Sequence, residues 1–294
     1  MEQNLDINRN PLVGKREVDM SKFVVFILSH GRPQKNSTYR TLRSCGYTGR
    51  IILVLDNEDS TLEEYYALYG KENTYVFDKK KVAERCDRMN NFGDMRATLF
   101  VRNATFDIAR DLGLKYFLVL DDDYGSFCHK REECEKTSRH LDEVFYYFLE
   151  YLINTPISSL AFSQGGDHIG GFDPNKMCKR KAMNSFFCMV DRPFKYYGSM
   201  NDDVNMYLIN GARGYIYLTF YPFMLHQEMT QVVEGGLADI YAKYGTFVKS
   251  FYSIMCAPSC CKIKLMGDKN MRLHHNIKWG LAVPCIINEK YKKR

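Results

Sequence analysis

Three consecutive aspartates, Asp121 to Asp123, directly follow the apolar run YFLVL at positions 116–120. Adjacent carboxylates repel one another, and a divalent cation between them removes that repulsion. Mg²⁺ and Mn²⁺ prefer oxygen ligands, and nucleotide phosphates commonly complete their coordination. The pattern therefore predicts Mn²⁺ or Mg²⁺ held by Asp121 and Asp123 together with a diphosphate. A solvated turn or a helix cap is the alternative interpretation.

The segments around these aspartates predict an α/β fold, with a Rossmann-like mixed sheet flanked by helices. Three apolar runs, FVVFIL (23–28), IILVL (51–55) and YFLVL (116–120), alternate with segments typical of helices. Such runs indicate parallel strands covered on both faces, and ligands bind at the carboxyl ends of these strands. A helix is expected from about Arg96 to Leu112, because apolar residues recur there every three or four positions and Gly113 can cap it.

Beyond residue 130 the expected elements are a helix at 141–153, strands at 158–163 and 182–190, a helix after Asn201, and a strand at 215–225. No repeat or linker divides the chain. We therefore expect an N-terminal extension, 1–22, followed by one domain, 23–294. Residues 23–125 would bind a nucleotide, and residues 126–294 would bind an acceptor.

Composition excludes two classes of protein. Ten cysteines scattered over 294 residues, with no CxxC pair, do not form the dense framework of a small secreted domain. The polar N-terminus MEQNLDINRN is no signal peptide, and no apolar run reaches the roughly 20 residues of a membrane span. We expect a soluble cytoplasmic protein with no membrane partner. Its net charge of +6 is compatible with a polyanionic partner.

The acidic triplet resembles the DxD motif of glycosyltransferases with the GT-A fold, which holds the metal bound to a sugar nucleotide. Two further strand ends carry motifs in the same order along the chain as in these enzymes. They are SHGRP (29–33), where Arg32 would meet the nucleotide, and LDNED (55–59), where Asp56 would contact uracil or ribose. An Arg or Asp in such a loop is otherwise usually solvated. The donor-binding residues that the resemblance implies are His30, Gly31, Arg32, Asp56, Arg102, Asp121 and Asp122.

The sequence NDDVN (201–205) resembles the acidic motif of inverting GT-A enzymes, whose carboxylate takes the proton from the acceptor hydroxyl. A carboxylate suits this role when an enclosed site raises its pKa. The resemblance implies Asp203 as the general base and Asp202 as its support. If the enzyme retains configuration, the motif would hold the sugar instead. An ordinary helix N-cap is the other alternative.

GT-A enzymes often add a late histidine to the metal ligands. His226 in FMLHQE is the first candidate, with His274 and His275 of RLHHNIKW in reserve. A hydrogen-bonded structural histidine is the alternative. A zinc site built from Cys256, Cys260, Cys261 and these last two histidines is a further interpretation, although CxxxCC departs from the usual zinc spacings.

A narrower resemblance is to the TET-associated glycosyltransferases of phages and other viruses. The motifs that carry it are ILSHGRP, VLDNED, FLVLDDDY, KYGTFVKSFYSIM (243–255), RLHHNIKW (272–279) and VPCIINEKYKKR. They extend from about residue 23 to the end of the chain. The family implies transfer of a sugar, such as glucose from UDP-glucose, to a hydroxymethylated pyrimidine of the 5-hydroxymethylcytosine type in double-stranded DNA. A viral protein would act in the cytoplasm of the infected host cell.

A DNA acceptor would give a role to several basic clusters, because lysine and arginine neutralise phosphates. We expect contacts from Lys130, Arg131, Lys179, Arg180 and Lys181; solvated surface is the alternative for each. Some of the many aromatic residues could stack on an extruded base. Three other functions stay open: a GT-A transferase acting on protein or glycan, a nucleotidyltransferase, and a non-catalytic DNA-binding protein.

Overall fold

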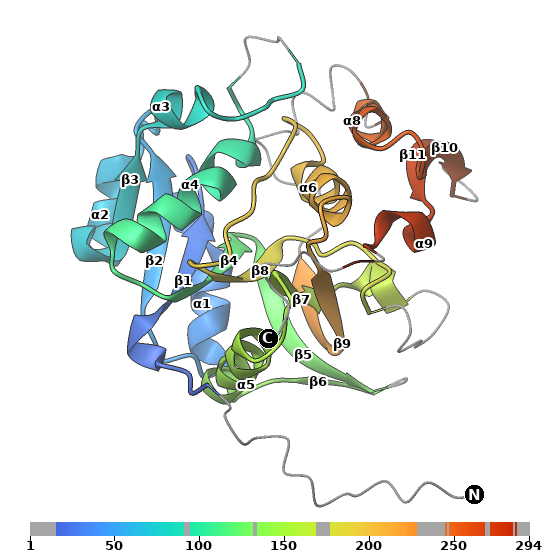
Figure 1. Cartoon of the computed structure of the whole chain (residues 1–294). Helices are drawn as coiled ribbons and strands as arrows, with labels where there is room; N and C mark the ends of the chain where they lie inside the picture. Colours follow the sequence, from blue (N-terminus) through green and yellow to red (C-terminus); the bar gives the residue numbers. More distant parts are fainter. Residues whose placement is uncertain are drawn as a thin grey trace, which may run out of the picture.

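A nine-stranded sheet forms the centre of the described chain (Figure 1). The computed structural model describes residues 16–90, 95–131, 134–168, 177–227, 245, 247–267, 271–284 and 286. The strand order is β3-β2-β1-β4-β8-β7-β9-β5-β6. The strands are β1 (Phe23–Leu28), β2 (Ile51–Asp56), β3 (Thr74–Phe77), β4 (Tyr116–Asp121), β5 (Tyr124–Arg131), β6 (Cys134–Thr137), β7 (Ser159–Ser163), β8 (Ser185–Met189) and β9 (Tyr217–Gln227).

The first four strands are parallel, and the sheet becomes mixed beyond β4. Strand β8 pairs antiparallel with both β4 and β7, whereas β7 and β9 are parallel. In the β1–β4 pair Leu28 lies opposite Asp121, and in the β2–β3 pair Asp56 lies opposite Phe77. The carboxyl ends of β1, β2 and β4 therefore meet at one edge, which brings the residues after each strand together.

Helices cover both faces of the sheet. They are α1 (Ser37–Ser44), α2 (Leu62–Tyr69), α3 (Lys79–Ala83), α4 (Thr98–Asp111), α5 (Leu141–Ile153), α6 (Asp202–Gly211), α8 (Val248–Cys256) and α9 (Trp279–Ala282). Short 3₁₀ turns are η1 (Met20–Lys22), η2 (Pro33–Lys35), η3 (Lys71–Asn73) and η4 (Gly165–His168). A separate ribbon pairs β10 (Cys261–Met266) with β11 (Arg272–Ile277). The expected α/β class and the mixed sheet flanked by helices are confirmed.

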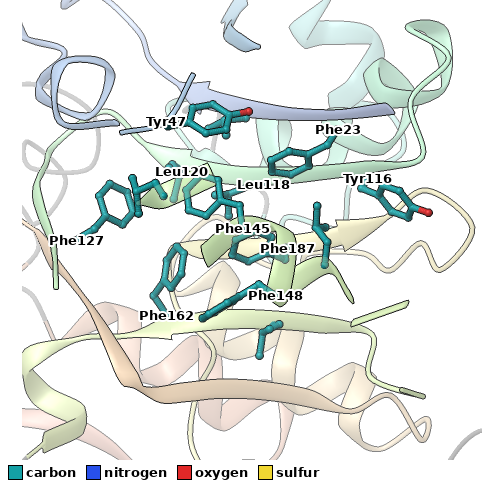
Figure 2. Packing of buried hydrophobic residues seen from close by; sticks show 14 of the residues in the cluster. Phe23, Tyr47, Tyr116, Leu118, Leu120, Phe127, Phe145, Phe148, Phe162 and Phe187 are labelled. Carbon is teal, nitrogen blue, oxygen red and sulfur yellow. The ribbon is translucent and has the colours of Figure 1, made fainter. Parts of the chain in front are cut away.

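Alternate residues of the central strands enter two different cores, because side chains point to opposite faces along a strand. Val25 and Ile27 of β1 pack in the core that contains α1 and α5, whereas Val24 and Phe26 pack with α4 and α6. Figure 2 shows the first core, where phenylalanines from several strands surround Phe145 of α5. Burial on both faces explains why these strands are continuously apolar.

The expected helix before the aspartates is confirmed as α4, and Gly113 follows it with a φ of +64°. Its buried face differs in one respect from the expected apolar stripe, because Arg102 is buried together with Ala104 and Ile108. A charged residue at this position is not part of the apolar repeat. Its burial requires charged partners at the sheet edge.

The elements expected beyond residue 130 are also confirmed, as α5, β7, β8, α6 and β9. Residues 1–15 of the proposed N-terminal extension lie outside the described residues, whereas Arg16 donates its backbone N–H to Asn154 Oδ1 (2.9 Å) after α5. The division into two functional halves stays a prediction. In the part of the chain that the structure describes, no helix is both long and apolar enough to span a bilayer.

Candidate active site

The three aspartates at the end of β4 do not share one environment. Asp122 is 2% exposed, and its carboxylate accepts hydrogen bonds from Ser29 Oγ (2.5 Å) and Arg32 Nη2 (2.6 Å). Asp121 and Asp123, on either side, are half-buried. The motif therefore fixes its middle residue inside the protein and leaves the two outer carboxylates at the surface of the sheet edge, as a pair of cation ligands requires.

Arg102 connects the end of β4 with the acidic pair of α6. Its guanidinium donates from Nη1 to Asp202 Oδ2 (3.0 Å), and from Nη2 to Asp121 Oδ1 (3.3 Å) and Asn184 Oδ1 (3.1 Å). The Arg102 side chain is only 3% exposed. Thr98 Oγ1 donates to the other Asp202 oxygen (3.1 Å). One buried cation thus holds two acidic motifs, about 80 residues apart in sequence, in a fixed relation.

Burial and mutual repulsion raise the pKa of this acidic group. Loss of solvent raises the pKa of Asp121 and of Asp202 to about 6, although the charge of Arg102 lowers both. Nearby carboxylates add to the rise: Asp123 and Asp203 for Asp121, and Asp203 and Asp121 for Asp202. Burial also raises the pKa of Asp123. The site therefore holds more carboxylates than Arg102 can neutralise, and a divalent cation would be attracted to it.

A pair of amides supports Asp123 from the neighbouring strands. Gln227 Nε2, at the end of β9, donates to both Asp123 oxygens (3.1 and 3.2 Å), and its own Oε1 accepts from Asn184 Nδ2 (3.2 Å). Asn184 has a φ of +51°, a left-handed conformation that is uncommon for residues other than glycine. Its two amide atoms therefore link Arg102 to the Asp123 side of the site.

A second cluster lies at the ends of β1 and β2. His30 Nδ1 contacts Asp56 Oδ2 (2.8 Å), and the Gly31 N–H donates to Asp59 Oδ2 (2.8 Å) with a φ of +66° at the glycine. Lys79 Nζ lies 3.5 Å from Asp56 Oδ1. Burial alone would raise the pKa of Asp56, but the hydrogen bond and charge of His30, with Lys79, lower it. The Asp56 bond raises the pKa of His30.

The acidic pair of α6 follows a residue in a left-handed conformation. Asn201 has a φ of +58°, and its Nδ2 lies within hydrogen-bond distance of Ser253 Oγ (3.0 Å) and His275 Nδ1 (3.1 Å). Asp202 uses both oxygens for Thr98 and Arg102. For Asp203, the described contacts are a hydrogen bond from the Val204 N–H to Oδ1 and the charge interaction with Arg102. Asp203 Oδ2 therefore has no hydrogen bond among the described residues.

Comparison by sequence decides the family. A family model described as TET-Associated Glycosyltransferase matches residues 23–236. The chain belongs to the TET-associated glycosyltransferase family. The resemblance noted from the motifs is confirmed, and the family makes the chain a glycosyltransferase. Among curated proteins, none matches this glycosyltransferase by sequence.

Several solved structures also resemble the glycosyltransferase. A glucosyl-3-phosphoglycerate synthase from Mycobacterium tuberculosis, in complex with Mn²⁺, UDP and phosphoglyceric acid, matches with a TM-score of 0.46 and 9% identity, over 87% of each chain. A mannosyltransferase from Pyrobaculum calidifontis, in complex with GDP-mannose and Mn²⁺, matches with a TM-score of 0.47 and 8% identity, over 80% of this chain and 64% of its own. S. aureus TarS 1–349, in complex with UDP-GlcNAc, has a TM-score of 0.41 and 11% identity, over 79% and 66%. The assignment rests on the family model.

The expected metal ligand His226 forms no set of close ligand atoms with Asp121 and Asp123 among the described residues. Its Nε2 contacts the Glu135 carboxylate, and the two side chains form a group with Cys128 whose ligand atoms lie within 4.8 Å of one another. Successive residues of β9 face opposite sides, so Gln227 reaches Asp123 whereas His226 reaches Glu135. The role of His226 as a ligand of the glycosyltransferase metal stays a prediction without a described contact to support it.

The alternative zinc site is not formed by the described side chains. Within the ranges described, the Cys128–Glu135–His226 group is the only set of three or more such ligand atoms within 4.8 Å of one another. Cys256 Sγ instead contacts the sulfur of Met89, and His275 bonds Asn201. The reserve metal candidates His274 and His275 lie in the β10–β11 ribbon of the glycosyltransferase.

The expected DNA-binding residues differ in exposure. Lys179 is exposed and Lys181 is half-buried. Arg180 donates to the Asp167 backbone oxygen (3.0 Å) and lies over a tyrosine ring, so its charge is engaged within the protein. Lys130 Nζ lies 3.8 Å from Glu135 Oε2. The side chain of Arg131 lies outside the described residues. All five contacts stay predictions.

Some residues of the site were not expected from the sequence. They are Ser29 and Tyr65, whose hydroxyls contact each other (2.7 Å) beside Asp122, and Lys79, Asn184 and Gln227. Ser29 directly follows β1, and Lys79 comes two residues after β3. Their places at strand ends could have indicated a role in the site. Asn184 and Gln227 carry no such signal, because only the folded sheet brings β8 and β9 to the DxD motif.

Proposed function

We propose that the chain transfers a sugar, glucose in the simplest case, from a UDP-sugar to a hydroxymethylated pyrimidine of the 5-hydroxymethylcytosine type in double-stranded DNA. Membership of the TET-associated glycosyltransferase family supports sugar transfer and, by its name, a modified DNA base as acceptor. The observation that carries the proposal is the joining of the DxD motif to the acidic pair of α6 through Arg102.

Asp121 and Asp123 fit a divalent cation. Both are half-buried carboxylates at the sheet edge, both have a raised pKa, and oxygen ligands of this kind suit Mn²⁺ and Mg²⁺. A bound cation would act there as a Lewis acid that stabilises charge on the leaving diphosphate. In the proposal His226 remains the candidate third ligand, which would require it to leave Glu135.

The cluster around Asp56 suits the nucleoside end of the donor. Asp56 stays ionised because His30 and Lys79 lower its pKa, so it can accept hydrogen bonds from uracil or ribose. Gly31 donates to Asp59 of this cluster and Arg32 donates to Asp122, so this loop joins the proposed nucleoside site to the DxD motif, where the diphosphate would bind. Arg102 acts on the donor through Asp121, as a positioning residue, since its guanidinium is buried.

Asp203 is the proposed general base. Asp202 is held on both oxygens, whereas Asp203 Oδ2 has no described hydrogen bond and can meet the acceptor hydroxyl. In an inverting reaction, Asp203 takes the hydroxymethyl proton as the oxygen attacks the anomeric carbon. The new C–O bond forms as the bond to the diphosphate breaks, and UDP leaves. Asp202 and Arg102 fix the start of α6 during this step.

The test is transfer to defined DNA. Purified protein, MnCl₂ and UDP-glucose are incubated with a duplex that contains 5-hydroxymethylcytosine, and the digested nucleosides are analysed by mass spectrometry. A hexose added to the modified nucleoside, and none on a plain cytosine duplex, is the expected result. Transfer to a protein or glycan alone, or a product that carries UMP with release of glucose 1-phosphate, would favour the other functions.

A further inference from the structure

The β10–β11 ribbon presents an exposed basic face. Lys262 lies opposite Asn276, and Lys264 lies opposite His274, so these four residues share one side of the ribbon. Residues 262–266 are all exposed. Neither strand contains an aspartate or a glutamate. The two strands therefore carry positive charge that no acidic residue within them offsets.

The lysines of this face have no acidic partner in the described chain. No ion pair of Lys262, Lys264 or Lys278 occurs among the residues described. Large apolar side chains of β10 are also exposed: Met266, on the face of Lys262 and Lys264, is 44% exposed, and Leu265, on the other face, is 56% exposed. Exposed apolar side chains of this size are typical of a surface that contacts a partner.

The end of the ribbon at Cys261 and Ile277 packs against α6, the helix that begins with the acidic pair. Cys261 and Ile277 pack with Val204 and Leu208 of that helix. His275 is buried, and burial, together with the charge of His274 and of nearby lysines, lowers its pKa to about 3. A neutral His275 accepts at Nδ1 from the Asn201 amide (3.1 Å), directly before Asp202. Because alternate residues of a strand face opposite sides, one face of the ribbon is fixed against α6, and Lys262 and Lys264 lie on the other face.

Other basic residues lie on the same side. Lys181 and Lys249 are close enough to His275 to lower its pKa, so they add to the positive charge near the ribbon. Figure 1 shows β10 and β11 beside α8, on the opposite side of the molecule from α2 and α3. Lys181, one of the residues that the sequence indicated, therefore lies near the buried end of the ribbon.

We propose that the β10–β11 ribbon binds the phosphate backbone of the duplex DNA acceptor through Lys262 and Lys264. This deepens the proposed function and rests on it. A strand of six residues is about 20 Å long, and a major groove about 12 Å wide admits a two-stranded ribbon. Lysines without acidic partners favour a polyanion over a protein surface.

The experiment measures duplex binding by the full chain. Fluorescence anisotropy of a labelled duplex gives affinity at several salt concentrations for wild type, for Lys262→Ala/Lys264→Ala, and for a matched control, Lys22→Ala/Lys71→Ala. Lys22 and Lys71 are also exposed, but they lie in η1 and η3 beside β1 and β3. The ribbon variant should lose about two from the slope of log affinity against log salt and bind at least about tenfold more weakly at low salt.

Transfer kinetics separate this proposal from the proposed function. The ribbon variant should show a raised KM for hydroxymethylated duplex with kcat and melting temperature unchanged. Equal salt slopes for wild type and ribbon variant, equal losses in both double variants, or no duplex binding by wild type would each overturn the ribbon's role. The ribbon's role would also be overturned if the ribbon variant differed from wild type in its molecular mass in solution but bound DNA with the same affinity. That result would indicate that the ribbon contacts another copy of the protein. If wild type transfers no sugar to DNA, the proposed function fails, while the binding comparison still decides the ribbon.

Discussion

Two acidic clusters lie at the same edge of the sheet, and their pKa values shift in opposite directions. The pKa of Asp56 is lowered, despite its burial, by the hydrogen bond and charge of His30 and by the charge of Lys79. Burial raises the pKa values of Asp121 and Asp202 to about 6, although the charge of Arg102, which both contact, lowers them. The difference lies in the number of cations for each carboxylate, since burial acts on both clusters in the same sense.

The two clusters differ in how far nearby cations neutralise their buried carboxylates. The buried Asp56 carboxylate contacts both His30 and Lys79, and it is prepared for hydrogen bonds. The Asp121 cluster, with Asp123 and Asp203 close by, keeps excess negative charge in a partly buried place, where an unpaired charge costs free energy. That cost is relieved by a proton at low pH or by a divalent cation at neutral pH. The following changes test the comparison.

The largest effect is expected from Asp123→Asn. The substitution keeps the shape of the side chain and its place beside Gln227 but removes one of the two proposed cation ligands. Loss of several kcal/mol of charge stabilisation would lower the rate of sugar transfer by about a thousandfold. The rate is measured as UDP release with saturating donor and Mn²⁺.

The matched control for this variant is Asp191→Asn, which makes the same change at an exposed aspartate just after β8, where β8 pairs with the start of β4 and not with its carboxyl end. It should transfer sugar at the wild-type rate. Unchanged turnover in Asp123→Asn, with a melting temperature equal to that of wild type, would remove this carboxylate from the reaction.

Arg102→Met tests the shared cation of the charge-rich cluster. Methionine fills much of the space but leaves Asp121 and Asp202 without their opposing charge, so the free energy of unfolding should fall by about 3–5 kcal/mol at pH 8. The loss should be smaller at pH 5, because the carboxyl groups, which titrate near 6 even beside Arg102, then bind protons. Urea unfolding at both pH values measures it.

A surface ion pair provides the control for Arg102. Arg85 contacts Asp107, and the Arg85 side chain is 51% exposed. Arg85→Met should cost no more than about 1 kcal/mol at either pH. Equal costs for the two methionine variants would show that the buried cluster carries no excess charge.

The sequence predicted the sheet edge better than it predicted the contacts there. The apolar runs placed Asp56 and Asp121 at the carboxyl ends of strands, because burial on both faces leaves a continuously apolar pattern. Arg102 was assigned to the donor, since nothing in the sequence of α4 shows that an arginine is buried. Its partners Asp202 and Asn184 come from α6 and β8, and such long-range pairing is set by tertiary packing. His226 was predicted as a metal ligand from its place after the acidic motif; in the structure it contacts Glu135 while its neighbour Gln227 contacts Asp123, and its role as a ligand stays a prediction.

The pH dependence of cation binding should show the raised pKa that distinguishes the Asp121 cluster from the Asp56 cluster. Because Asp121 has a pKa of about 6 without a cation, protons compete with Mn²⁺ for it below that pH. The apparent Kd of Mn²⁺ should rise about tenfold for each pH unit below 6, and it should be nearly constant above pH 7. Calorimetric titration at pH 5, 6, 7 and 8 measures this. A Kd that does not change between pH 7 and pH 5 would place the cation on carboxylates with ordinary pKa values.

The smallest effect is expected at the Asp56 cluster, from His30→Gln. The bond to Asp56 raises the pKa of His30 above 6.5, so its charge adds stability that is fully present below the pKa of the unfolded state and is lost as pH rises through the higher folded value. The His30 side chain is 53% exposed, and solvent screening limits the contribution to about 1 kcal/mol or less. Urea unfolding should therefore show a destabilisation at pH 6 that disappears by pH 9. A larger loss at pH 9 than at pH 6 would mean that His30 acts there as a neutral hydrogen-bonding group, and that Lys79 alone balances the charge of Asp56.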